Sequence, residues 1–367
     1  QVYIQKGEYD RAITYFEKAL PIFIQAFGEK HPEVATIYND LGQVYIQKGE
    51  YDRAITYFEK VQPIYIQAFG EKHPNMAISY DNIGSAYIQK GEYDRAIAYY
   101  EKGLAILIQA FGEKHPNVAT NYNNIGLAYY QKGEYDRVIA YNEKALLILI
   151  QVFGEKHPEV ATSYNNLGQV YRQKGEYDRA IVYFEKAKAI TLIFLPLSHP
   201  NPKAFSQNLS RASNDRGMEL FGEKKYAEAL PYFQKALENA EQAEDWAFSL
   251  TYLNNIGSMH KRLGQYAEGL AALEKGLARA EQINLQIDEE LKQYPAETLQ
   301  KPEVQAKIAE LKNATLIRRM RYHKAGCLAG LGRKKEANEL YQQHQKEAEE
   351  ANDTRLLEDL KSDGIGN

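Results

Sequence analysis

The chain has 367 residues, of which 44% are hydrophobic and 26% charged, a composition that is ordinary for a folded protein and argues against disorder. Its net charge of −4 makes nucleic acid an unexpected partner, and its single cysteine, Cys327, excludes an intramolecular disulfide framework and a four-cysteine zinc site. No run of 18 apolar residues and no signal peptide is visible, so we expect a cytoplasmic protein without a membrane span.

From its first residues the chain repeats itself every 42 positions. The sequence Gly-Glu-Tyr-Asp-Arg begins at Gly7, Gly49, Gly91, Gly133 and Gly175. The dipeptide His-Pro begins at His31, His73, His115, His157 and His199. A period of this length predicts a solenoid, in which each unit packs on its neighbours and the core is one continuous spine.

Each unit is expected to fold as two helices. In the unit 32–73, Tyr38, Leu41 and Tyr45 form a helical stripe, which predicts a first helix, called helix A, over residues 33–47. A second stripe starts at Tyr51 and predicts helix B over residues 50–69. Gly42 lies inside helix A at a cost of about 1 kcal/mol relative to alanine. We expect this glycine to permit close approach of helix B at its small residue Ala54.

The stripe residues resemble the signature of the tetratricopeptide repeat, which is carried here by Tyr38, Leu41, Gly42, Tyr45, Ala54 and Phe58. The 42-residue length and the Gly-Glu-Lys-His-Pro loop are similar to the long repeats of kinesin light chains, whereas ordinary repeats have 34 residues. The resemblance implies an all-α, right-handed superhelical solenoid of antiparallel helix pairs. It also implies peptide recognition, without enzymatic activity and without a cofactor.

Five segments are expected along the chain. Residues 1–200 are a near-identical array of a half repeat and four repeats, and residues 201–280 hold two divergent units. A helical insertion follows over 281–313, with a weak last repeat over 314–345 and an acidic capping helix or tail over 346–367. The N-terminal half repeat is a candidate surface for self-association.

The candidate site is a pair of amide or acidic residues that recurs in helix A, off the core stripe. The pairs are Asn39-Asp40, Asp81-Asn82, Asn123-Asn124, Asn165-Asn166, Asn214-Asp215 and Asn254-Asn255. Asparagine is a poor helix former, so its recurrence needs a purpose. The resemblance places this face in a concave groove, where carboxamides can bind the backbone of an extended peptide. Variable neighbours would give selectivity; they include Gln43, Leu127, Gln169, Tyr130 and Arg172. The alternative is a structural ladder in which the amides bridge neighbouring A helices.

Other chemistry-bearing residues have simpler interpretations. The His-Pro histidines are too far apart for one metal ion and are expected to cap loops. Cys327 and His323 share a helix face, but no orienting third group is evident, so catalysis by this pair is not expected. Residues 311–335 carry basic side chains and no acid, and we expect solvent or the acidic tail to neutralise them. Trp246 is expected in the core.

The sequence therefore predicts a non-catalytic scaffold that binds a peptide or a protein segment in its groove. A second hypothesis is a ligand-sensing regulatory arm that acts in trans on a partner enzyme of a bacterial-type signalling or protease system. A third hypothesis, an enzyme, would place activity at residues 281–330.

Overall fold

A computed structural model describes residues 2–196, 199–351 and 353. The chain divides into two compact units, Gln1–Gly175 and Glu176–Asn367, each treated by itself. None of the described helices combines the length and apolar character that a membrane span requires.

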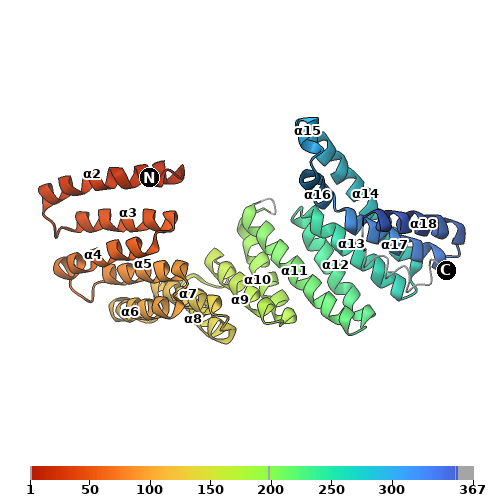
Figure 1. Cartoon of the computed structure of the whole chain (residues 1–367). Coiled ribbons are helices and arrows are strands. Elements are labelled where there is room, and N and C mark those ends of the chain that lie inside the picture. Colours follow the sequence, from red (N-terminus) through yellow and green to blue (C-terminus); the bar gives the residue numbers. More distant parts are fainter. Residues whose placement is uncertain (1, 197–198, 352, 354–367) are drawn as a thin grey trace. The chain divides into compact units, whose positions relative to one another are not determined.

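The first unit is a series of helices in which each packs on the next (Figure 1). Its helices are α1 (Val2–Gln5), α2 (Tyr9–Phe27), α3 (Pro32–Lys48), α4 (Tyr51–Phe69), α5 (Pro74–Lys90), α6 (Tyr93–Phe111), α7 (Pro116–Gln131), α8 (Tyr135–Phe153) and α9 (Pro158–Gln173). The odd-numbered members from α3 to α9 are the predicted A helices, and the even-numbered members from α2 to α8 are the B helices. The bounds of α3 and α4 lie within one residue of the predicted ones.

Local sequence signals set the ends of each helix pair. Proline occupies the first position of α3, where its missing N–H costs no hydrogen bond. Gly49 ends α3 with φ of 82°, and its N–H donates to the carbonyls of Tyr45 and Ile46. This left-handed position favours glycine and turns the chain into α4.

The core of the first unit is apolar, and ion pairs join its repeats at the surface. Leu41 and Phe58 are fully buried, and the stripe tyrosines Tyr45, Tyr87 and Tyr129 are nearly so. A lysine near the end of each A helix pairs with an aspartate at the start of the preceding B helix. These pairs are Lys48–Asp10 (2.8 Å), Lys90–Asp52 (2.7 Å), Lys132–Asp94 (2.7 Å) and Lys174–Asp136 (2.6 Å).

The second unit also consists of helix pairs, with two shorter helices inserted before the last pair. Its helices are α10 (Tyr177–Phe194), α11 (Pro200–Gly222), α12 (Tyr226–Gln242), α13 (Trp246–Arg262), α14 (Tyr266–Leu291), α15 (Ala296–Leu299), α16 (Pro302–Leu311), α17 (Ala314–Gly330) and α18 (Lys334–Glu350). Helix α17 packs on α13 and α14, so the last helix pair joins the array despite the intervening α15 and α16. Most of the predicted acidic tail lies outside the described residues.

The predicted fold class, an all-α solenoid of antiparallel helix pairs, is confirmed. The prediction that Gly42 permits close approach of helix B is confirmed, but the nearest group of helix B is not Ala54. A Cβ atom at Gly42 would lie 2.4 Å from Cε1 of Phe58, so the glycine makes room for an aromatic ring of helix B rather than for the backbone near Ala54. The same relation holds for Gly84 with Tyr100 and for Gly217 with Phe233.

Candidate functional site

The predicted amide pairs lie on the A helices, and most of their side chains are half-buried. Asn165 and Asn254 are buried, whereas Asp40 is exposed. The others are half-buried: Asn39, Asp81, Asn82, Asn123, Asn124, Asn166, Asn214, Asp215 and Asn255.

In the first repeats, these side chains bond to one another across neighbouring A helices. Asn82 Nδ2 donates to Asn39 Oδ1 at 3.4 Å, and Gln43 Nε2 donates to Asn82 Oδ1 at 3.3 Å. Asn39 Nδ2 also donates to the Tyr65 hydroxyl at 3.2 Å. The amides between α3 and α5 therefore form part of a structural ladder.

The same arrangement occurs in the second unit. Asn255 Nδ2, on α13, donates to Asn214 Oδ1, on α11, at 3.2 Å. The structural alternative predicted for the amide pairs thus describes the contacts at both of these places.

Between α5 and α7 the bridge is formed by an amide and a carboxylate. Asn121 Nδ2 donates to Asp81 Oδ1 at 2.7 Å. Gly103 on α6 leaves room for this pair, because a Cβ atom there would lie 3.1 Å from Asp81 Oδ1. Burial raises the pKa of Asp81 to about 7, and the hydrogen bond from Asn121 opposes the rise.

The central repeats differ, because two of their amides take part in no such bridge. Asn124 and Asn166 form no hydrogen bond with another side chain in the described part of the chain. Asn123 Oδ1 is buried without a hydrogen-bond partner among the described residues. An unpaired buried acceptor carries a desolvation cost of about 1–3 kcal/mol, which a ligand could relieve.

A pocket of about 190 Å³ lies at these central amides. Helix α7 contributes Asn123, Leu127 and Tyr130 to its lining. Helix α9 contributes Asn166, Gln169 and Val170, and α8 contributes Val138 and Asn142. Leu127 is 47% exposed and Gln169 is exposed, whereas Asn142 is only 6% exposed. The pocket therefore opens between two A helices and extends toward a B helix.

Five of the predicted site residues share this pocket: Asn123, Leu127, Tyr130, Asn166 and Gln169. Arg172 is half-buried on α9 and does not line it. Sequence reasoning missed Val138 and Asn142. Their signal was present, because the equivalent positions of the other repeats hold alanine and an aromatic residue.

The His-Pro histidines cap helices, as predicted. At the starts of α3, α5, α7, α9 and α11 the histidine Nδ1 accepts a hydrogen bond from the backbone N–H two residues later, at 3.3 Å for His31 and 3.1 Å for His115. At the starts of α3, α5, α7 and α9 the phenylalanine four residues before the histidine stacks on its ring, with centroids 4.4 Å apart for Phe111 and His115.

Two other predictions concern the second unit. Cys327 is fully buried, and burial raises the pKa of its thiol to about 11, so the sulfur stays protonated near neutral pH. The prediction for Trp246 is wrong: its ring is 41% exposed, and the Arg279 guanidinium lies 4.6 Å from the ring centroid.

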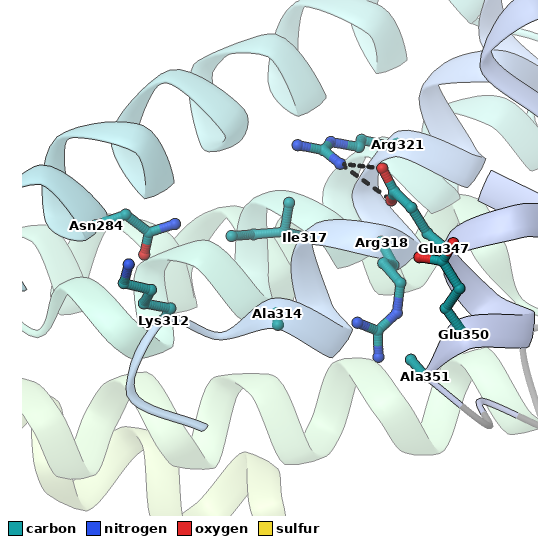
Figure 2. Close-up of a pocket in the computed structure, with 9 residues that line it drawn as sticks. All are labelled: Asn284, Lys312, Ala314, Ile317, Arg318, Arg321, Glu347, Glu350 and Ala351. Atoms are coloured by element: carbon teal, nitrogen blue, oxygen red, sulfur yellow. Dashed lines mark hydrogen bonds and ion pairs between the residues drawn. The ribbon is translucent and has the colours of Figure 1, made fainter. Parts of the chain in front are cut away.

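The basic segment is paired with acidic residues near the end of the described chain. Arg321 donates two hydrogen bonds of 3.1 Å to the Glu347 carboxylate, drawn as dashed lines in Figure 2. Both residues line a second pocket, of about 440 Å³. Arg318 contacts Asp353 at 3.4 Å, and Lys324 contacts Glu274 at 2.9 Å. Pairing with the predicted acidic segment 346–367 is therefore confirmed for Arg318 and Arg321, whereas the partner of Lys324 lies on α14.

Comparison with known proteins defines the class. A model of the tetratricopeptide repeat matches residues 1–67, 44–109, 75–146, 118–192 and 209–282, well over half of the chain. The chain belongs to the tetratricopeptide repeat family, whose members are generally non-catalytic scaffolds for protein interactions.

Solved structures resemble the chain in fold. BtubC (BKLC) from P. vanneervenii matches with a TM-score of 0.52 and 22% identity, over 65% of this chain and 90% of its own. Nearly identical TPR-like repeats from Podosopora anserina, assigned to kinesin light chain, match with a TM-score of 0.49 and 23% identity, over 59% and 95%. The apo form of RapI matches with a TM-score of 0.46 and 17% identity, over 80% and 98%. No curated protein matches the chain.

Proposed function

We propose that this protein is a non-catalytic scaffold that binds an extended peptide or protein segment along the A-helix face of its central repeats. The observation that carries the proposal is the change in the amide pairs along the chain. Bridges occupy the amides between α3 and α5, whereas Asn124 and Asn166 form no side-chain hydrogen bond among the described residues, and Asn166 lines a pocket.

The chemistry of these side chains suits a peptide backbone. A carboxamide has one acceptor oxygen and two N–H donors, so it pairs with both the C=O and the N–H of a peptide unit without reading its side chain. Leu127, Tyr130 and Gln169 line the same pocket, and Leu127 and Tyr130 differ from their counterparts in the other repeats, so these two would select among sequences. Self-association through the N-terminal half repeat and a cytoplasmic location stay predictions.

A capture experiment tests the proposal. The intact protein and an Asn124→Ala/Asn166→Ala variant are used as baits in extracts of the source cells. A Gln109→Ala/Gln151→Ala variant is the matched control, because it removes two exposed amides from the B helices. We expect the first variant to lose its specific partner and the control to retain it. Equal capture by all three proteins would contradict the proposal.

A further inference from the structure

One repeat departs from the others at a single place in its core. The B-helix position occupied by Phe58, Tyr100 and Phe184 holds Asn142 in α8. Four residues earlier, where the other three copies have alanine, α8 has Val138. An aromatic ring has thus been replaced by a shorter, polar side chain in the interior of an otherwise near-identical array.

The neighbouring repeats show what the ring fills. Phe58 is fully buried and Tyr100 is 3% exposed, and both rings lie where the A-helix glycine provides space. Gly126 is retained in α7, and a Cβ atom there would meet the Asn142 carboxamide, at 2.5 Å from Oδ1, in place of a ring. Helix α7 thus keeps the glycine that accommodates a ring in the other repeats, although α8 carries no ring at this position.

The space left by the missing ring belongs to the pocket between α7 and α9, to which α8 contributes Asn142 and Val138. Its walls are apolar where Leu127, Val138 and Val170 contribute, and its polar groups are amides and one tyrosine hydroxyl. Among the described residues no charged side chain lines it, so a charged occupant would lose its hydration without gaining a partner.

Two polar groups of the pocket determine which uncharged side chain it would bind best. Asn142 is 6% exposed and presents its carboxamide at the pocket, and the buried Asn123 Oδ1 has no hydrogen-bond partner among the described residues. An occupant that carries a hydrogen-bond donor at the end of an aromatic ring would satisfy the Asn123 acceptor while its ring contacts the apolar walls. Among protein side chains, tyrosine has this combination at the size of the missing ring.

We propose that this pocket binds a tyrosine side chain of the partner peptide, with the ring in the space vacated at Asn142 and the hydroxyl at the amides of Asn123 and Asn142. The inference rests on the proposed function, since it gives the peptide-binding face a specificity pocket. Phosphorylation of that tyrosine would abolish binding, because the pocket offers the phosphate no cation.

The test uses N-acetyltyrosinamide as the probe and the full chain as the receptor. Binding is followed by saturation-transfer NMR and by the shifts of asparagine side-chain amide signals. A Val138→Ala/Asn142→Phe variant restores the residues of the neighbouring repeats and refills the space. We expect it to bind the probe at least tenfold more weakly than the native protein. N-acetylphenylalaninamide should bind the native protein about three- to tenfold more weakly than the tyrosine probe, and the phosphotyrosine amide should not bind.

A second variant, Asn142→Tyr, keeps the test decisive if the double variant is poorly folded, because Tyr100 shows that this residue is accommodated. Equal binding of the tyrosine probe to native protein and refilled variants, or equal binding of the phenylalanine and tyrosine probes, would overturn the inference. One outcome separates the two proposals. If the refilled variants lose the tyrosine probe while Asn124→Ala/Asn166→Ala still captures the partner, the tyrosine pocket is supported and the proposed peptide-binding face is contradicted. If the amide variant alone loses the partner, the groove stands and the pocket proposal fails.

Discussion

Gly42 shows how a single residue sets the spacing of a helix pair. A Cβ atom at this position would meet the Phe58 ring at 2.4 Å, and that ring is fully buried. We predict that Gly42→Ala lowers the free energy of unfolding by about 1–3 kcal/mol, because the core must shift to accept the methyl group. Urea denaturation measures the change.

The control for this substitution is Gly222→Ala, at a helical glycine with no atom within 4 Å of the added Cβ. It should raise the free energy of unfolding by about 0.4–1 kcal/mol, because alanine allows the unfolded chain fewer conformations than glycine does. Equal stability of Gly42→Ala and the native protein would remove the packing explanation for the helix-interior glycines.

Asp81 is predicted to make stability depend on pH. Its folded pKa of about 7 exceeds the value of about 3.9 expected in the unfolded chain, so the folded state binds more protons between these values. The contribution of Asp81 to stability therefore falls as pH rises from about 4 to about 7. Asp81→Asn should raise the free energy of unfolding by about 2–4 kcal/mol at pH 8 and far less at pH 4.5.

Urea titrations at the two pH values check this prediction, with Glu113→Gln, an exposed acid in a loop, as the control. A stability difference between Asp81→Asn and the native protein that is the same at both pH values would contradict the assignment. The pKa of Asp81 could not be predicted from sequence, because it depends on how Asn121 and Gly103 enclose the carboxylate in space.

At the scale of the element, α3, α5, α7, α9 and α11 begin with a histidine cap rather than with the more common serine or aspartate. His115 Nδ1 accepts from the Asn117 N–H at 3.1 Å, and the ring also stacks on Phe111. We predict that His115→Ala destabilises the protein by about 0.5–2 kcal/mol, whereas His115→Asn, which keeps a capping oxygen, loses less. Thermal unfolding of the two variants separates the cap from the stack, and equal losses would assign the effect to the stack.

Helix positions were more predictable from sequence than side-chain partners were. Tyr38, Leu41 and Tyr45 gave the stripe of α3, and Pro32 and Gly49 gave its ends, because these signals are local. The role of Phe58 opposite Gly42 and the bridge between Asn39 and Asn82 involve residues 16 and 43 positions apart, respectively, so they depend on how the helices pack. The sequence alone shows Asn142 as a break in the repeat. The pocket that results from it could not be predicted, because it depends on how α7, α8 and α9 pack.

At the scale of the whole molecule, the energetics should follow nearest neighbours. In a solenoid each repeat contacts only adjacent ones, so destabilisation of one repeat has a local range. We predict that Gly42→Ala accelerates amide hydrogen exchange in α3, α4 and α5 while leaving the rates in α13 and α14 unchanged. Mass spectrometry of the exchanged protein measures both regions, and uniform acceleration would indicate one cooperative core.

The measurement that tests the central claim most directly is site-specific photo-crosslinking on the full chain. A photoreactive phenylalanine analogue replaces either Leu127, beside the pocket, or Leu147, which is 67% exposed on α8. If the A-helix face of the central repeats binds the partner, the probe at Leu127 crosslinks a partner segment, and Asn124→Ala/Asn166→Ala abolishes that product, while Leu147 gives none. Crosslinking at Leu147 to the same extent, or a Leu127 product that persists in the amide variant, would contradict the account.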